Sequence, residues 1–192
     1  MSKLYFRYGV MTAGKSTLLL QVAHNYRTNG MNVIIVKPQI DTKGENKVVS
    51  RIGISSNVDI LLGLTENIYD YEEIAKQSCC ILVDESQFLT KEQAISFWKF
   101  SKEFNIPVIC YGLKTNFKGE LFEGSATLMA YADELEELKT ICNCGKTARF
   151  NARKVNGEFT LSGEEVVIDG NSEVEYIPLC GKCYLKKVIE PI

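Results

Sequence analysis

The stretch Gly9-Val10-Met11-Thr12-Ala13-Gly14-Lys15-Ser16-Thr17 decides the fold class of this 192-residue chain. It matches the phosphate-binding pattern G-x-x-x-x-G-K-S, and it stands between an alternating strand pattern and an apolar helical pattern. Glycines let the backbone curl so that several N–H groups face one anion, and the N-terminus of the next helix adds partial positive charge. We expect Lys15 to reach the β- and γ-phosphates of a nucleotide and the Ser16 hydroxyl to ligate Mg²⁺. The residues predicted to bind the nucleotide here are Gly9, Val10, Met11, Thr12, Ala13, Gly14, Lys15 and Ser16.

Composition excludes some classes of partner. Hydrophobic residues make up 45% of the chain, charged residues 24%, and the formal net charge is −2. No block of Lys and Arg is present, which argues against a nucleic-acid partner, since phosphate backbones are bound by clustered cations. No apolar run approaches the roughly 18–20 residues of a membrane span. The N-terminus lacks the pattern of a signal peptide, so we expect a cytoplasmic protein without a membrane partner.

Strand and helix patterns alternate through the first two-thirds of the chain. Short, continuous apolar runs predict strands at 3–9, 32–36, 79–84 and 107–111, and such runs are typical of a parallel sheet buried on both faces. Helical patterns lie at 15–29, 71–77 and 91–105. This alternation predicts an α/β fold, an open parallel sheet with helices on both faces.

A change of composition near residue 140 predicts two domains, a nucleotide-binding α/β domain over 1–140 and a small domain over 141–192. The second domain is poor in large aliphatic residues, so we expect its apolar core to be too small for it to fold unaided. Within it, Asn156-Gly157 predicts a tight hairpin turn. In the first domain, the polar segment 41–57 is expected to be mobile or ordered by ligand.

Two acids follow the apolar strand Ile81-Leu82-Val83, and they predict the chemistry. Ligands of parallel sheets bind at the carboxyl ends of the strands, so Asp84 and Glu85 should face the phosphate loop. Asp84 suits the carboxylate that holds Mg²⁺, and Glu85 can take a proton from an attacking hydroxyl or water. The pair alone does not separate a kinase from an ATPase.

Four cysteines near the C-terminus form two close pairs, Cys142/Cys144 and Cys180/Cys183. Four thiolates suit tetrahedral Zn²⁺ with no open position, and such a zinc would be structural. Its binding free energy would also be folding free energy for the small domain. The alternative is four free or redox-active thiols.

Several motifs together resemble the type II thymidine kinases across essentially the whole chain. They are Asp84-Glu85-Ser86-Gln87-Phe88, Gly112-Leu113 followed by Phe117, Ser50-Arg51-Ile52-Gly53, and Phe122-Glu123-Gly124-Ser125. The resemblance implies a RecA-like P-loop sheet with a C-terminal zinc-binding domain that carries a lasso loop. It also implies transfer of the γ-phosphoryl group of ATP to the 5′-hydroxyl of thymidine, a salvage reaction that gives dTMP, in a cytoplasmic homotetramer.

The resemblance also assigns residues. Glu85 aligns with the general base, and Asp84, Glu85, Ser86 and Gln87 complete the ATP site. Arg51 and Arg153 align with arginines near the phosphates. The thymidine pocket would include Met11, Phe88, Leu113, Phe117 and Tyr176, together with the lasso residues Ile168, Asp169 and Gly170. Two departures from the family pattern stand out: Asp169 occupies a position where glycine is common, and one cysteine pair is spaced C-x-C.

Two other functions are compatible with parts of the sequence. A RecA-like ATPase would use Glu85 to activate water in place of a sugar hydroxyl. A zinc-ribbon adaptor for nucleic acid or protein would use the nucleotide as a switch, and would not need Glu85 as a base.

Overall fold

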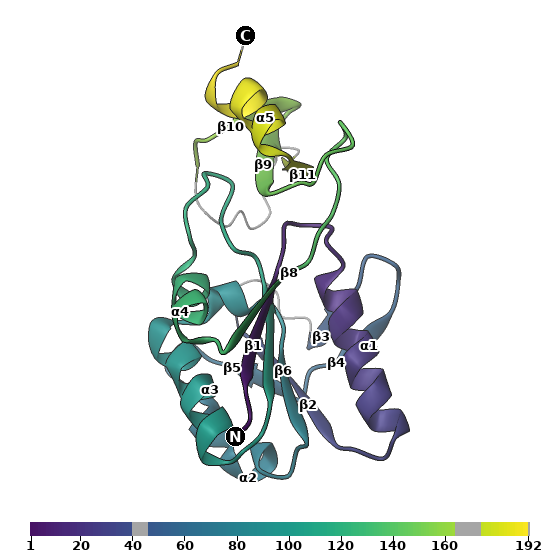
Figure 1. The fold of residues 1–192 in the computed structure, drawn as a ribbon, viewed down its shortest axis with the longest axis vertical. Coiled ribbons are helices and arrows are strands. Elements are labelled where there is room, and N and C mark those ends of the chain that lie inside the picture. Colours follow the sequence, from purple (N-terminus) through teal and green to yellow (C-terminus); the bar gives the residue numbers. More distant parts are fainter. Residues whose placement is uncertain (40–45, 164–173, 192) are drawn as a thin grey trace.

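The computed structural model describes residues 1–39, 46–163 and 174–191. Among them, six strands form a central sheet in the order β5-β2-β6-β7-β1-β8, and every neighbouring pair is parallel (Figure 1). The strands are β1 (Leu4–Tyr8), β2 (Val33–Pro38), β5 (Ile60–Leu62), β6 (Cys80–Val83), β7 (Val108–Gly112) and β8 (Glu134–Glu137). All of their carboxyl ends therefore lie at one edge of the sheet.

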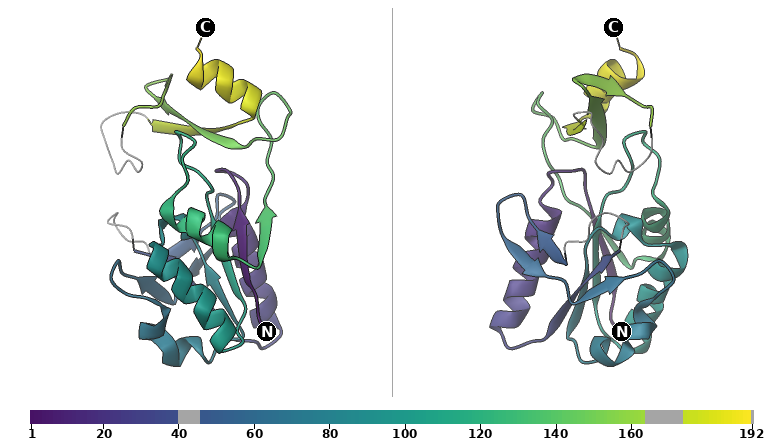
Figure 2. Two further views of the ribbon diagram at one scale, coloured as in Figure 1. Left: turned by 60° about the vertical axis from the view of Figure 1, so that its left-hand side comes forward. Right: turned by 180° about the vertical axis from the view of Figure 1, so that it is seen from behind.

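Helices cover both faces of this sheet, as the sequence predicts (Figures 1 and 2). On one face α1 (Lys15–Thr28) buries Leu19 and Leu20 against Ile35 and Leu82. On the other face the apolar cluster includes side chains from α2 (Glu72–Ala75), α3 (Lys91–Glu103) and α4 (Glu123–Tyr131). The four predicted strands are confirmed, because their side chains alternate between the two apolar clusters and need both helix layers.

Local signals set the helix ends. At the start of α3, the Thr90 hydroxyl accepts the Gln93 N–H at 3.2 Å, and the Gln93 side chain accepts the Thr90 N–H at 3.0 Å. This reciprocal pair satisfies two backbone donors that no helical carbonyl can reach. After α1, Gly30 adopts a left-handed φ of 72°, which glycine takes at no steric cost.

The polar segment that includes residues 46–57 is more regular than the sequence predicts. Strands β3 (Lys47–Val49) and β4 (Ser55–Asn57) pair antiparallel as a separate hairpin. Its turn is closed by the Ser50 N–H on the Ile54 carbonyl at 2.8 Å. Residues 40–45 of the same segment lie outside the described ranges.

The C-terminal part of the chain forms a second sheet beyond the carboxyl edge of the first (Figure 2). Its strands are β9 (Phe150–Val155), β10 (Glu158–Thr160) and β11 (Val174–Leu179), in the order β10-β9-β11. A two-residue turn joins β9 to β10, with φ of 50° at Asn156 and 86° at Gly157, as predicted. The chain then continues into α5 (Gly181–Tyr184) and the π-helical turn Leu185–Ile189. The boundary at residue 140 stays a prediction.

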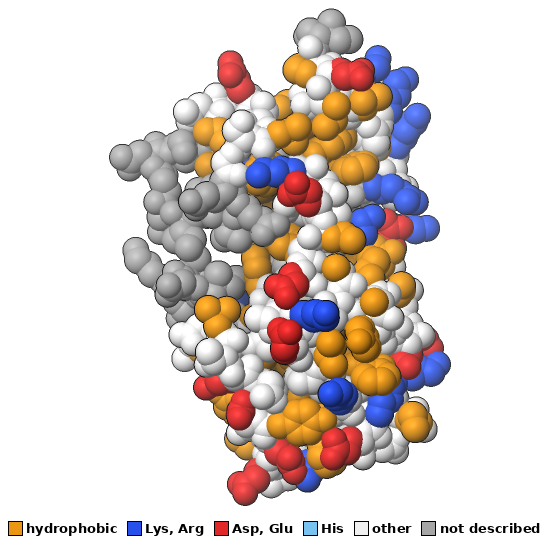
Figure 3. All heavy atoms as spheres, turned by 90° about the vertical axis from the view of Figure 1, so that its left-hand side faces the viewer, with side chains coloured by type: hydrophobic (Ala, Val, Ile, Leu, Met, Phe, Trp, Pro, Cys, Tyr) orange, Lys and Arg blue, Asp and Glu red, His pale blue; other side chains and the backbone are white. Residues whose placement is uncertain are grey.

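The surface is mixed in character. The face shown in Figure 3 carries acidic, basic and hydrophobic side chains interspersed, with Lys and Arg gathered along one edge of the upper part. Within the described ranges, no helix has both the length and the apolar character needed to cross a membrane.

Candidate active site

The predicted phosphate-binding loop joins β1 to α1. Thr12 and Gly14 have left-handed φ values of 69° and 75°, and these turn the backbone sharply before the helix begins. The Lys15 ammonium donates to the Val10 carbonyl at 3.0 Å and the Gly9 carbonyl at 3.4 Å. Desolvation lowers the pKa of Lys15, although the nearby acids oppose this shift. The lysine therefore lies folded over the loop, within reach of an anion bound there.

The acid pair follows β6, at the same edge of the sheet. Asp84 is buried, and its Oδ2 accepts the Ser16 hydroxyl at 3.5 Å. Burial, and then the charge of Glu85, raise the pKa of Asp84 to about 7. A bound cation would favour the ionised form of this carboxylate. Hydroxyl and carboxylate oxygens are ligands that Mg²⁺ accepts, so Ser16 and Asp84 fit the predicted magnesium site.

Glu85 is fixed by an unusual backbone and by one neighbour. It has φ 50° and ψ 36°, a left-handed conformation that is uncommon outside glycine and frequent at functional sites. Gln87 donates its side-chain amide to Glu85 Oε2 at 2.6 Å, and Gln87 Oε1 accepts the Leu113 N–H at 3.0 Å. Gln87 and Ser86 are both buried.

A cleft of about 400 Å³ lies over the phosphate loop. Glu85 lines it from the end of β6, Leu113 from the end of β7, and Arg51 from the turn of the β3–β4 hairpin. The other lining residues are Met11, Thr12, Gly14, Lys15, Ser16, Thr17, Val49, Ser50 and Ile52. Thr17, Val49, Ser50 and Ile52 have no predicted role in the sequence, and the two apolar ones carry no signal of their own in a polar segment.

The four predicted metal ligands converge. The sulfurs of Cys142, Cys144, Cys180 and Cys183 all lie within 4.8 Å of one another. A tetrahedron of Zn–S bonds of about 2.3 Å has edges of about 3.8 Å, so these spacings suit one zinc ion. Backbone hydrogen bonding, first from Cys144, lowers the pKa of Cys142 to about 6, whereas hydrogen bonds with the other thiols raise that of Cys183 to about 12. Thiols this close could not all ionise without a cation among them.

Comparison with known proteins identifies the family. The sequence profile described as thymidine kinase matches residues 2–184. The chain belongs to the thymidine kinase family. It is 46% identical over 188 residues to the thymidine kinase of Legionella pneumophila (strain Lens), and the alignment covers 94% of this chain and 88% of that protein.

Further thymidine kinases match over similar lengths. The Haemophilus influenzae protein is 46% identical over 192 residues, 97% of this chain and 98% of its own. The Francisella tularensis protein is 43% identical over 198 residues, 99% of this chain and 100% of its own. Among solved structures, Bacteroides Pif1 bound to single-stranded DNA gives a TM-score of 0.39 at 12% identity over 71% of this chain and 38% of that chain.

The residues that the thymidine kinase resemblance predicts for the nucleoside fall into two groups. Met11 and Leu113 line the cleft together with the phosphate loop. Phe117, Tyr176 and Arg153 meet one another and are not among the residues that line it: the Arg153 guanidinium lies 4.4 Å from the ring centroid of Phe117 and 5.7 Å from that of Tyr176. These distances are typical of cation–π contacts.

The remaining predicted residues lie in three different settings. Arg153 is buried on β9 against these rings and does not line the described cleft, whereas Arg51 does. Phe88 packs edge-on against Phe122, with ring centroids 5.7 Å apart. The lasso residues Ile168, Asp169 and Gly170 lie outside the described residues.

Proposed function

We propose that this chain transfers the γ-phosphoryl group of ATP to the 5′-hydroxyl of thymidine, giving dTMP and ADP. The observation that carries the proposal is the position of Glu85 in one cleft with Lys15, Ser16 and Arg51. Membership of the thymidine kinase family supports the nucleoside substrate.

The residues divide the work by their chemistry. Glu85 acts as the general base: its carboxylate accepts the 5′-hydroxyl proton while the oxygen forms a bond to the γ-phosphorus and the bond to ADP breaks. Lys15 and the loop N–H groups stabilise the charge on the transferred group, and Arg51 adds a second cation from the hairpin. Gln87 holds the Glu85 carboxylate in place through its 2.6 Å hydrogen bond.

Two metals accompany this proposal. Ser16 and Asp84 would hold the Mg²⁺ that arrives with ATP, which neutralises phosphate charge. The four cysteines would hold a structural Zn²⁺, which fixes the ends of the 145–179 segment. That segment carries Arg153 and Tyr176, so zinc would support the nucleoside pocket without entering the reaction.

The thymine base would be bound next to the Phe117, Tyr176 and Arg153 group. Aromatic faces suit a flat base, and main-chain groups would supply its hydrogen bonds. A cytoplasmic homotetramer is the assembly that the family resemblance implies.

A coupled assay of ADP release tests the proposal. Wild-type enzyme with Mg·ATP is assayed with and without thymidine, and we expect turnover only when thymidine is present. Glu85→Gln should reduce kcat by about 10²–10⁴-fold, the range of general-base catalysis, while ADP binding persists. Glu92→Gln, which replaces an exposed carboxylate on α3 by an amide, is the matched control. ADP release that ignores thymidine would instead favour an ATPase in which Glu85 activates water.

A further inference from the structure

One peptide group of the phosphate loop is held from both ends. The Val10 carbonyl accepts hydrogen bonds from the Lys15 ammonium at 3.0 Å and from the Ala13 N–H at 3.2 Å. On the opposite side of the same peptide unit, the Met11 N–H donates to Asn151 Oδ1 at 2.7 Å. Because a peptide unit is planar, these bonds together set the direction of both groups.

Asn151 reaches this peptide from a distant part of the chain. It lies on β9, 140 residues beyond Met11, and it is 3% exposed. Its amide nitrogen lies 3.5 Å from the Thr115 carbonyl, a long contact with the loop that follows β7. A buried side-chain amide is expensive unless it is hydrogen-bonded, so this residue is placed for its polar contacts.

The apolar neighbours support the same connection. Val10 is buried in the C-terminal cluster together with Ala152, Cys142 and Cys180. The loop is therefore bonded to the second sheet through Met11 and packed against it through the preceding side chain. The backbone next to Met11 is also unusual, since Thr12 has a left-handed φ of 69°.

We infer that Asn151 is a positioning residue that fixes the orientation of the Val10–Met11 peptide, and so couples the cysteine-bearing sheet to the phosphate loop. The inference rests on the proposed function in one respect. When Lys15 turns to the phosphates of ATP, the peptide loses its lysine contact. The bond to Asn151 then keeps the Met11 N–H facing the second sheet, and keeps the Val10 carbonyl from turning toward the anion.

Two substitutions separate this role from simple packing. Asn151→Leu keeps the number of side-chain heavy atoms and removes the acceptor, whereas Asn151→Asp keeps an oxygen for the Met11 N–H. We expect hydrogen–deuterium exchange of the Met11 backbone N–H, measured by NMR, to be at least about tenfold faster in N151L. We also expect the Kd for Mg·ADP, measured by calorimetry, to rise about fivefold or more. N151D should restore the Met11 exchange rate to within about threefold of wild type, whereas its negative charge beside the phosphate loop should still weaken Mg·ADP binding.

Tyr184→Phe is the matched control in the same region. It removes another buried hydrogen bond, 2.6 Å from the Tyr184 hydroxyl to the Phe117 carbonyl, and this bond does not involve the phosphate loop. We expect Y184F to raise the KM for thymidine and to leave Met11 exchange and ADP affinity unchanged. The two variants should thus affect different substrates.

The outcome that overturns the inference is N151L with wild-type Met11 exchange and wild-type ADP affinity, measured well below its melting temperature. If N151L does not fold, Asn151→Ser is measured instead, since its side chain is too short to reach Met11. Met11 exchange needs neither nucleotide nor thymidine, so a wild-type protein that fails to phosphorylate thymidine would remove the proposed function and leave this test intact.

Discussion

The side-chain amide of Gln87 joins the Glu85 carboxylate to the backbone of the next strand. Its nitrogen lies 2.6 Å from Glu85 Oε2, and its oxygen lies 3.0 Å from the Leu113 nitrogen. One buried side chain thus sets the spacing between the acid that follows β6 and the residue that follows β7. The Asp-Glu-x-Gln-Phe and Gly-Leu motifs are separate in sequence, and this residue makes them one unit.

Replacing this amide should lower turnover more than it lowers nucleotide affinity. Gln87→Leu removes both bonds, leaves the Leu113 N–H without its acceptor, and frees the Glu85 side chain. We expect kcat to fall by about 10–100-fold with little change in the KM for ATP, because a base held loosely loses its alignment. The same substitution at an exposed position of α1, Gln21→Leu, is the control. Equal kcat values for Q87L and wild type would show that Glu85 needs no such support.

A substitution at Gly124 tests how closely α4 packs against the segment that carries Glu85. A Cβ atom there would lie 2.6 Å from the Leu89 carbonyl and 2.7 Å from the Ser86 carbonyl, so α4 can approach the Glu85 segment only with glycine at this position. Helix propensity alone predicts that Gly124→Ala stabilises the protein by up to about 1 kcal/mol. The close contact predicts the opposite sign, a loss of about 1–3 kcal/mol, because backbone atoms must move.

Urea unfolding decides between these two signs. Gly181→Ala is the matched control, since a Cβ there meets nothing closer than 3.8 Å, an atom of the Phe150 ring. We expect a lower midpoint for G124A and a nearly unchanged one for G181A. A raised midpoint for G124A would mean that α4 can move away from the acid segment without penalty.

Metal removal should destabilise the C-terminal part first. The four sulfurs share one site, and structural zinc supplies folding free energy where the apolar core is small. We expect Cys144→Ser to lower the zinc content, measured by elemental mass spectrometry, and to lower the melting temperature. Cys79→Ser, an exposed cysteine outside the cluster, is the matched control and should change neither. If C144S kept both zinc and stability, the cluster would be a set of free thiols.

Local patterns explain how much of this architecture the sequence predicts. The apolar runs of β2, β6 and β7 are short and continuous, so they indicate buried parallel strands directly. Strand β8 is not predicted by such a run, because its sequence, Glu-Leu-Glu-Glu, is mostly exposed at the edge of the sheet. Its place depends on the register with β1, a long-range pairing that no local pattern encodes.

The site residues also divide into those that local sequence predicts and those that depend on long-range contacts. Residues within a motif, such as Lys15, Asp84 and Glu85, could be assigned because loop and strand end fix their neighbours. The position of Arg153 could not, since its burial against Phe117 depends on how the second sheet meets the first. The contact of Asn151 with the phosphate loop was missed for the same reason.

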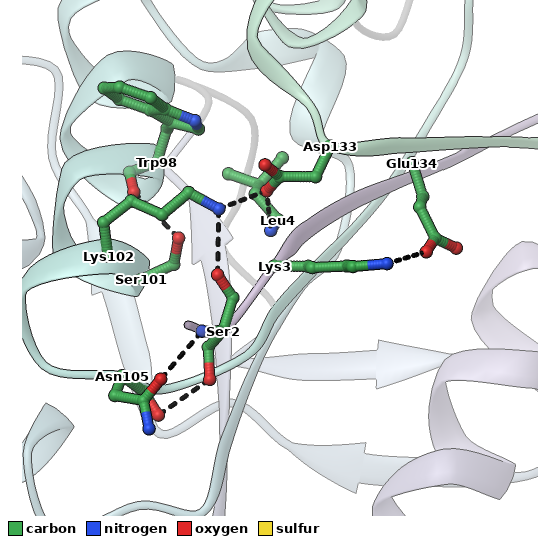
Figure 4. Close-up of polar contacts among 9 residues, drawn as sticks. All are labelled: Ser2, Lys3, Leu4, Trp98, Ser101, Lys102, Asn105, Asp133 and Glu134. Atoms are coloured by element: carbon green, nitrogen blue, oxygen red, sulfur yellow. Dashed lines mark hydrogen bonds and ion pairs between the residues drawn. The ribbon is translucent and has the colours of Figure 1, made fainter.

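The start of the chain is held by a network of polar and charged side chains around the first residue of β1 (Figure 4). Lys102, on α3, forms an ion pair with Asp133 and donates to the Ser2 carbonyl at 2.8 Å. Asp133 also accepts the Leu4 N–H at 2.7 Å, and Asn105 accepts the Ser2 N–H at 2.8 Å. These bonds join α3, the start of β1 and the segment before β8.

Acid should weaken this network in a defined way. Partial burial raises the pKa of Asp133, but the ammonium of Lys102 and the Leu4 N–H lower it more, so the net shift is downward. A carboxylate with a depressed folded-state pKa stabilises the protein above its unfolded pKa, about 3.9, and that contribution is lost as the pH falls through the lower folded value. The loss therefore belongs to the region below about pH 4.

Asp133→Asn isolates the charge, because the amide oxygen can still accept the Leu4 N–H. We expect the variant to lose about 1–2 kcal/mol of unfolding free energy at pH 7, measured by urea denaturation. This difference should shrink toward zero as the pH falls below about 4, since the wild-type carboxyl becomes neutral as well. Glu134→Gln is the control: its pair with Lys3 is half exposed and should contribute little. A difference between D133N and wild type that stayed constant down to pH 2 would mean that packing, and not charge, holds the start of β1.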